Sequence, residues 1–300
     1  MFIVTGAQGF IGSRMVKYLN SKGIDDICVI DDVEIDEVRG YATKVNYTNL
    51  QDTKFKKLYP IILDENTILP EDNIEAVFHF GAISNTLEKD FGKIKKYNID
   101  YTYQLNRACK KRNIPLIFSS TAAIYGNGNG PLNLYAESKL QNEKDISDYA
   151  MCFRLFNVYG PNESHKGRMA SVIFKWFNEL KETNSIKIFE NSKEYKRDFI
   201  FVDDVCKTFY NAYKKYKPGI RDLGTGTQNN FDYVADIVIK EYGSGNKNYV
   251  PMPDDLKLQY QTNTEAKIYN DLELNFINIE TGIKNYISHL KNNLLVSSNN

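Results

Sequence analysis

Tyr135 and Lys139 are suited to proton transfer, because a spacing of four residues on a helix places both side chains on one face. A tyrosine has a pKa near 10, so a role as a base near neutral pH requires a shift of about three units, or about 4 kcal/mol. One cation about 4 Å away, at an effective dielectric constant near 20, supplies about that amount. In a chain with 21 tyrosines such a pair also arises by chance, and it then marks only an amphipathic surface.

Thr121 lies before this pair, in the run SSTAAIYG at residues 119–126. The run follows an expected strand at residues 115–118, so Thr121 belongs near the carboxyl edge of a sheet, where ligands bind in folds of this type. Its hydroxyl would steady a reacting oxygen; the alternative is a loop threonine that caps its own backbone. This position makes the pair of Tyr135 and Lys139 specific.

Gly6, Gly9 and Gly12 separate the first expected strand from the first expected helix. Without β-carbons the backbone can approach a pyrophosphate, and a helix N-terminus favours its negative charge. The alternative is a tight turn between strand and helix, but a carboxylate, Asp31, follows at the end of the next strand. The combination predicts binding of a nicotinamide dinucleotide.

Asp31 and Asp32 favour NAD over NADP, because a carboxylate here accepts hydrogen bonds from the ribose and repels a 2′-phosphate. Arg39 and Lys44 argue the other way, since a cation folded over the ribose would neutralise that phosphate. The expected cofactor is therefore NAD(P), with a preference for NAD. Taken alone, the two aspartates would suit an ordinary solvated turn.

The elements that position these residues alternate short apolar runs with helix-length amphipathic segments, the pattern of βαβ units. We expect strands at residues 2–5, 28–30, 76–79, 115–118, 151–154 and 199–202, and helices at 10–20, 94–112, 135–149, 171–182 and from about 205. The fold class is α/β: a Rossmann-type doubly wound parallel sheet with a smaller, discontinuous C-terminal substrate domain. Residues 1–160 and about 198–230 would bind NAD(P), residues 161–197 and 231–290 would bind substrate, and residues 291–300 would be a frayed tail.

Composition narrows the class of protein. The 300 residues carry 38 basic and 38 acidic side chains, so no overall charge draws the chain to nucleic acid or to a membrane. Residues 166–197 nevertheless hold eight Lys and Arg against four acids, a local net charge of +4 that suits an anionic ligand. The hydrophobic fraction of 42% is ordinary for a globular protein with a sizeable core.

The four cysteines and three histidines are scattered without a Cys-x-x-Cys pair, which argues against a disulfide framework and against a metal site. We expect the cysteines to be small buried side chains in a reducing cytoplasm. The first residues lack the basic leader and apolar stretch of a secretory signal, and no run of 18 apolar residues could span a bilayer. These features predict a cytoplasmic protein.

The motifs together resemble the extended short-chain dehydrogenase/reductase family of nucleotide-sugar epimerases and dehydratases, from residue 2 to about 290. Within it, NVYGPNESHKGRMASV at residues 157–172 is similar to the signature of ADP-L-glycero-D-manno-heptose 6-epimerases, as are KRDF at 196–199, PDDLK at 253–257 and the pair Tyr260-Gln261. The resemblance implies an isomerase that passes a hydride from C6 of the heptose to NAD(P)⁺, forms a transient 6-keto sugar and returns the hydride to the opposite face. It also implies a homo-oligomer that makes lipopolysaccharide precursors.

The resemblance further implies a second base, because inversion of a carbinol needs proton transfer on both faces. Lys166 matches that base, so Tyr135 and Lys166 would serve opposite faces. Thr121 would polarise the oxygen, and Lys139 would hold the ribose. Which base serves which epimer stays open.

The contacts that the resemblance implies fall into two sets. Cofactor contacts match Gly6, Gly9, Phe10, Ile11, Gly12, Asp31, Asp32, Phe80, Gly81, Ala82, Ile83, Ser84, Asn98, Lys139 and Val158. Substrate contacts match Asn157, Arg168, Lys175, Phe189, Glu190, Asn191, Ser192, Arg197 and Tyr260. The guanidinium of Arg197 suits a diphosphate.

The chain departs from the family pattern at four positions. Arg168 stands where a serine is usual, Lys175 replaces a histidine, Asp32 replaces an asparagine, and Val38 replaces a loop lysine. The two cations leave the sugar and the nucleotide open. Asp32 and Val38 argue against the NADP preference that is usual in the family.

Other functions on this fold stay possible. A 4-epimerase would have no evident use for Lys166. A dehydratase would need an acidic pair where this chain has Ala122 and Ala123. A net dehydrogenase would accumulate reduced cofactor with its product, and a silent nucleotide-binding protein would often lack the tyrosine or the lysine.

Overall fold

The computed structural model describes residues 1–33, 35–36, 41–42, 47–64, 66–253, 261–272 and 275–297. Contacts within the chain divide it into two compact units. Unit 1 comprises Met1–Tyr125, Gly130–Leu155 and Cys206–Arg221, and unit 2 comprises Gly126–Asn129, Phe156–Val205 and Asp222–Asn300. Residues 156–160, 198–205 and 222–230, which the sequence assigned to the cofactor domain, thus group with unit 2.

A seven-stranded sheet forms the centre of unit 1. Its strands lie in the order β12 (Gly219–Leu223), β8 (Met151–Leu155), β7 (Leu116–Thr121), β6 (Ala76–His79), β1 (Phe2–Thr5), β2 (Ile27–Asp31) and β5 (Lys57–Pro60). The neighbours from β8 to β5 pair in parallel, which confirms the expected doubly wound sheet. The chain adds β2 and β5 on one side of β1 and then β6 to β8 on the other. The carboxyl ends of strands beside such a reversal are where open α/β sheets bind ligands.

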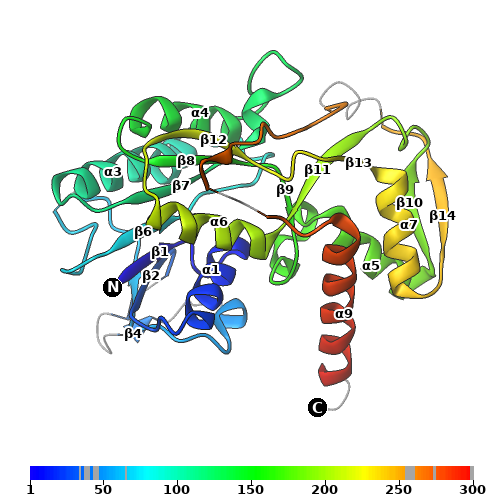
Figure 1. Cartoon of the computed structure of the whole chain (residues 1–300), viewed down its shortest axis with the longest axis horizontal. Helices are drawn as coiled ribbons and strands as arrows, with labels where there is room; N and C mark the ends of the chain where they lie inside the picture. The colour runs from blue at the N-terminus through cyan, green and yellow to red at the C-terminus, as the bar shows by residue number, and fades with distance from the viewer. Residues whose placement is uncertain are drawn as a thin grey trace. The chain divides into compact units, whose positions relative to one another are not determined.

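Helices cover both faces of this sheet (Figure 1). On one face, against α1 (Phe10–Ser21) and the part of α6 (Val202–Lys214) that belongs to unit 1, the ring of Phe2 stacks on Phe78 and meets Tyr213 edge-on. On the other face, Ile3 and Val77 pack in a buried cluster with residues of α3 (Tyr101–Lys111) and α4 (Leu134–Ile146). Alternate residues of each short strand are therefore buried on opposite faces, as the apolar strand runs predicted.

The helix expected at residues 94–112 is three consecutive segments. These are α2 (Phe91–Ile94), the π-helical turn η2 (Lys95–Asp100) and α3. The smaller elements of unit 1 are β3 (Ile35–Asp36), β4 (Tyr41–Ala42), η1 (Tyr47–Leu50) and η3 (Ala122–Tyr125). Asn98 lies inside the π-helical turn, and its side chain is hydrogen-bonded to Ile83 and Ser138, which lie outside it.

Unit 2 contains two small sheets and three longer helices around a second core. The three-stranded sheet has the order β13 (Gln228–Asn230), β11 (Lys196–Phe201), β9 (Asn157–Tyr159), and the two-stranded one pairs β10 (Ser185–Phe189) with β14 (Asn246–Val250). The helices are η4 (Ser164–Met169), α5 (Val172–Thr183), α7 (Phe231–Tyr242), η5 (Asn270–Leu272) and α9 (Ile279–Ser297). Aromatic side chains such as Trp176, Phe199 and Tyr286 fill the core between them.

The expectation of a frayed tail from residue 291 is wrong for residues 291–297, which continue α9. Leu290 and Leu294 pack against the core of unit 2, and the ammonium of Lys291 donates to the carbonyl oxygens of Glu241 and Tyr242 at the end of α7. This packing and capping keep the last turns helical. Among the described helices, none is both long enough and apolar enough to cross a membrane.

Candidate functional site

The glycine loop connects β1 to α1 with almost no space for side chains. Gly6 has a φ of 65°, and a β-carbon there would lie 2.7 Å from the Cα of Gly81. A β-carbon on Gly12 would lie 2.1 Å from the carbonyl oxygen of Gly6. Gly9 caps α1 without a side chain, and the first turn holds no acid, so no carboxylate of the first turn repels an anion at this end of the helix.

Asp31 at the end of β2 anchors this loop. One carboxylate oxygen accepts from the backbone N–H of Gln8 at 2.6 Å, and the other accepts from the N–H of Asp32 at 2.8 Å. Burial raises the pKa of Asp31, while Asp32 is exposed. The Oε1 of Gln8 is buried and has no hydrogen-bond partner among the described residues. The tight cradle, the open helix end and this unpartnered oxygen fit a dinucleotide.

A buried chain of hydrogen bonds, which the motifs did not predict, fixes the neighbouring loop after β6. The N–H of Gly81 donates to the hydroxyl of Thr5 at 3.1 Å, and that hydroxyl lies 2.6 Å from Nδ1 of His79. The Nε2 of His79 lies 2.9 Å from the hydroxyl of Thr102. Burial lowers the pKa of His79 well below its usual value, so the ring is neutral and structural.

Asn98 holds the next part of the same loop. Its Oδ1 accepts from the N–H of Ile83 at 2.8 Å, and its Nδ2 donates to the carbonyl of Ile83 and to the hydroxyl of Ser138, each at 3.0 Å. The residue is fully buried. Asn98 therefore fixes the loop at residues 80–84, and its expected contact with the cofactor stays a prediction. Of those residues, Ser84 is exposed and the ring of Phe80 packs on Phe209.

Thr121, Tyr135 and Lys139 come together in unit 1, as predicted. A hydrogen bond from Thr121 lowers the pKa of Tyr135, but burial outweighs it and raises that pKa to about 12. Lys139 is 1% exposed; its ammonium donates to the carbonyl of Ser119 at 2.7 Å and lies 4.4 Å from the ring centroid of Phe118. Burial lowers the pKa of Lys139 to about 7.

The expectation that Lys139 brings the pKa of Tyr135 toward neutrality is wrong for this structure. The ammonium lies 6.0 Å from the centroid of the Tyr135 ring, and the loss of hydration dominates the titration of both groups. The hydroxyl and the amine are thus both stabilised in their neutral forms. A bound ligand that brings charge into this region would change the balance.

A buried ion pair beside this cluster was missed. Glu143, 1% exposed, accepts from the hydroxyl of Ser120 at 2.5 Å and from the guanidinium of Arg154 at 2.7 Å and 2.9 Å. Arg154 also donates to the hydroxyl of Tyr125 at 2.7 Å. The sequence spacing held a signal for Glu143, because Glu143 lies four residues after Lys139, on the same helix face. The pair ties α4 to the ends of β7 and β8, where Thr121 is placed.

In unit 2, the segment that carries the expected second base is exposed on one side and anchored on the other. Lys166 is half-buried in η4, and burial lowers its pKa. Burial also lowers the pKa of Lys175 on α5, and Arg168 is exposed. Gly167, which follows Lys166, has a φ of 52°, a backbone conformation that only glycine adopts readily.

The remaining predicted contacts of unit 2 have mixed environments. Asn157, Glu190 and Asn191 are exposed, Val158 and Phe189 are half-buried, and Ser192 is buried. Arg197 is only 6% exposed and donates to the carbonyl oxygens of Lys196 and Thr262, so its contact with a diphosphate stays a prediction. Four residues named in the sequence analysis lie outside the described part of the chain: Val38, Arg39, Lys44 and Tyr260.

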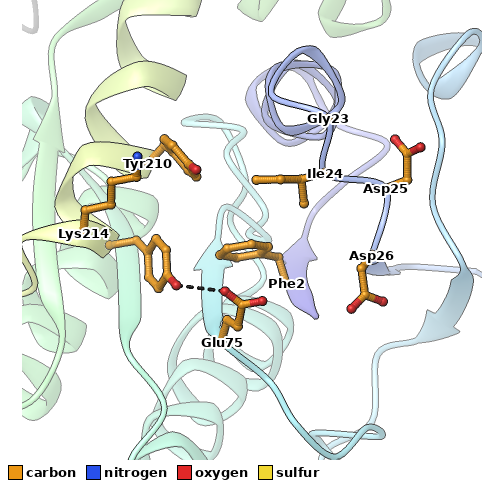
Figure 2. Close-up of a pocket in the computed structure, with 9 residues that line it drawn as sticks. Phe2, Gly23, Ile24, Asp25, Asp26, Glu75, Tyr210 and Lys214 are labelled. Atoms are coloured by element: carbon orange, nitrogen blue, oxygen red, sulfur yellow. Dashed lines mark hydrogen bonds between the residues drawn. The ribbon is translucent and has the colours of Figure 1, made fainter.

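A cavity of about 700 Å³ lies elsewhere in unit 1 (Figure 2). It is lined by Phe2, Gly23, Ile24, Asp25, Asp26, Glu75, Tyr210, Tyr213 and Lys214. Phe2 begins β1, so this cavity lies at the amino edge of the sheet, opposite to the glycine loop. None of the predicted site residues lines it.

Comparison with protein families matches residues 2–223 to the NAD dependent epimerase/dehydratase family. A curated ADP-L-glycero-D-manno-heptose-6-epimerase of Brachyspira hyodysenteriae is 38% identical, with 97% of this chain and 98% of the relative covered. The solved ADP-L-glycero-D-manno-heptose-6-epimerase of Helicobacter pylori has a TM-score of 0.82 at 23% identity, covering 97% of this chain and 96% of that one. A UDP-N-acetylglucosamine 4-epimerase of Methanobrevibacter ruminantium has a TM-score of 0.80 at 23% identity, covering 97% and 98%.

The two solved structures show the shared fold, and the family match and the curated relative carry the relationship in sequence. Among the described residues, no group of three or more His, Cys, Asp or Glu is arranged to hold a metal ion, and the four cysteines are buried. The resemblance that the motifs indicated is confirmed, and the chain belongs to the NAD dependent epimerase/dehydratase family.

Proposed function

We propose that this protein is a nucleotide-sugar epimerase that inverts C6 of ADP-glycero-manno-heptose through a 6-keto sugar. The observation that carries the proposal is the cluster of Thr121, Tyr135 and Lys139 in the same unit as a glycine cradle that fits a dinucleotide. The 38% identity to a heptose epimerase over 97% of the chain supports the choice of sugar. When bound, a nicotinamide cofactor would supply reversible acceptance of a hydride.

Tyr135 transfers the proton of the C6 hydroxyl in this proposal. Its hydroxyl is neutral at rest because burial raises its pKa to about 12, so the phenolate must form before Tyr135 can accept the proton of the C6 hydroxyl. The hydrogen bond from Thr121 favours the phenolate, and positive charge brought by the bound cofactor acts in the same direction. Lys139, whose Nζ lies over the ring of Phe118 at 4.4 Å from its centroid, would orient the ribose.

Lys166 is the proposed second proton-transfer group. Burial lowers its pKa, so its amine is more accessible near neutral pH than that of a solvated lysine. Two groups are required because the 6-keto sugar presents opposite faces before and after its end group rotates. Tyr135 and Lys166 would each complete the reaction on one face.

We further propose NAD as the cofactor. Both oxygens of Asp31 accept backbone N–H groups of the chain itself, and exposed Asp32 adds a second negative charge beside them. Two carboxylates at this position repel a 2′-phosphate. Release of the nucleotide from purified protein and measurement of its mass tests this choice: a mass of NADP would contradict it.

For the substrate, we propose that Arg168 and Lys175 interact with the nucleotide diphosphate. Arg168 is exposed and Lys175 half-buried, and both lie in the segment with a local charge of +4. The protein is proposed to act in the cytoplasm as a homo-oligomer, as the sequence resemblance implies. No nucleic acid or membrane partner is proposed.

The test is proton NMR of ADP-D-glycero-β-D-manno-heptose after incubation with cofactor-loaded protein. We expect the L-glycero epimer without net reduction of cofactor; an unchanged C6 would refute the proposal. Tyr135→Phe and Lys166→Met should each abolish turnover while cofactor stays bound. Tyr103→Phe, at a 42% exposed tyrosine, and Lys181→Met, at an exposed lysine, are the matched controls. Normal turnover by Lys166→Met would remove the second base.

A further inference from the structure

Glu163 is a fully buried carboxylate at the start of the segment that carries Lys166. One oxygen accepts from the N–H of Ser171 at 2.5 Å, and the other accepts from the hydroxyl of Ser171 at 2.6 Å and from the N–H of Gly160 at 3.4 Å. Tyr286 of α9 is hydrogen-bonded to the same carboxylate. A buried charge is costly unless it is bonded in this way, and these bonds fix the position of the carboxylate.

The partners of Glu163 stand at both ends of one loop. Gly160 follows β9, and Ser171 caps α5 by accepting from the N–H of Phe174. Between them, the N–H of Lys166 donates to the carbonyl oxygen of Glu163 at 3.0 Å. The side chain of Glu163 therefore joins the two ends of the loop. Because η4 has no fully buried residue of its own, it depends on this connection.

The same carboxylate is the negative charge that acts on Lys166. Lys175 on α5 is the cation that opposes it, and His165 lies within electrostatic reach. Lys175 in turn is influenced by Glu163 and by Glu179 of its own helix. Burial pushes both lysines toward the neutral amine, and Glu163 acts in the opposite direction.

We propose that Glu163 is a positioning residue for Lys166: it closes the loop at Gly160 and Ser171, fixes the backbone of Lys166 between them, and places a negative charge within electrostatic reach of the lysine. Burial favours the neutral amine of Lys166, and the charge of Glu163 favours the ammonium form, which can return a proton to the substrate oxygen. This inference rests on the proposed role of Lys166 and adds a residue that the motif comparison does not assign.

The test measures the charge of Lys166 without turnover. Cofactor-loaded protein is acetylated with trace acetic anhydride across pH 7–10, and each lysine is quantified by mass spectrometry. In Glu163→Gln we expect Lys166 and Lys175 to be labelled at least about threefold faster at pH 8, because loss of the nearby negative charge raises the fraction of neutral amine. Lys181 and Lys187, both exposed, should label at unchanged rates and serve as internal references.

Two variants separate charge from loop closure. Ser171→Ala and Tyr286→Phe remove hydrogen bonds of Glu163 and leave its charge, so the labelling of Lys166 should stay within about twofold of the parent while hydrogen exchange of residues 160–171 rises. Unchanged labelling in Glu163→Gln with retained cofactor, or an equal rise in Ser171→Ala, would overturn the charge role. Unchanged hydrogen exchange in both bond-deleting variants would overturn loop closure, even if Glu163→Gln failed to fold.

The outcome for Glu163 is distinguishable from the outcome for the proposed function. If Lys166→Met keeps normal turnover, the second-base proposal fails whatever the labelling shows. If Lys166→Met is inactive and Glu163→Gln also leaves labelling unchanged, the base stands and the role of Glu163 fails. When both proposals hold, Glu163→Gln shifts the pH profile of kcat with little change in KM.

Discussion

Replacement of Lys139 by methionine should make the cofactor-free protein more stable at neutral pH. The ammonium is 1% exposed, and burial lowers its pKa from 10.5 to about 7. Below pH 7 the lysine is protonated in both the folded and the unfolded chain, so the folded state bears the whole cost of burying the charge. Above about pH 10.5 the lysine is neutral in both states, and that cost is absent.

The size of the effect follows from the same shift. The burial cost is about 4.5 kcal/mol at pH 6.5 and about 1.5 kcal/mol at pH 9.5. Methionine also forfeits the hydrogen bond to the carbonyl of Ser119, which is worth about 1.5 kcal/mol. Lys139→Met should therefore gain about 3 kcal/mol at pH 6.5 and almost nothing at pH 9.5.

Urea unfolding of nucleotide-free protein at the two pH values measures this difference. Lys144→Met is the matched control, because Lys144 is exposed on the same helix, and its effect should stay within about 0.5 kcal/mol at both pH values. The reasoning is refuted if Lys139→Met destabilises the protein at pH 6.5, or if its effect is the same at pH 6.5 and 9.5.

Four further variants test other parts of the site. Gly12→Ala should abolish nucleotide retention, because its β-carbon would lie 2.1 Å from a backbone oxygen, whereas Gly9→Ala, at 3.1 Å, should only weaken it; nucleotide content by absorbance decides. Glu143→Ala should cost about 3 kcal/mol in urea unfolding, since it leaves the charge of Arg154 without its partner, and a cost under about 1 kcal/mol would contradict a buried pair. Asp32→Asn should raise the affinity for NADP relative to NAD by titration calorimetry, and an unchanged ratio would deny Asp32 that role.

The fold was largely predictable because its signals are local. Strands such as Phe2–Thr5 and Ala76–His79 are short, mainly apolar runs, and their bounds agree with the expected ones. The π-helical turn at Lys95–Asp100 was not predicted, and the bonds of its Asn98 to Ile83, a residue in a different loop, form only in the folded chain. The last turns of α9 were missed for a similar reason, since Leu294 gains its packing only in the folded core.

The candidate site was predictable where types and spacing carry chemistry, as for Tyr135, Lys139 and the three glycines. The pKa shifts of these groups were not predictable, because the sequence shows which charges are near one another along the chain but not how much water is removed from each. Glu143 was missed although its spacing from Lys139 held a signal, because the sequence does not show that Arg154 is its partner. Glu163 was missed because only its burial shows that the carboxylate bonds to Ser171 rather than to water.

The most direct test of the account uses ADP-heptose that carries deuterium at C6. Because the proposed reaction removes and returns the same hydrogen within one active site, the epimerised product should keep its deuterium at C6 by NMR, and no reduced cofactor should accumulate at 340 nm, a wavelength where only the reduced nicotinamide absorbs. Loss of the label to solvent, or reduced cofactor formed in proportion to product, would contradict an epimerase that works by transient oxidation at C6.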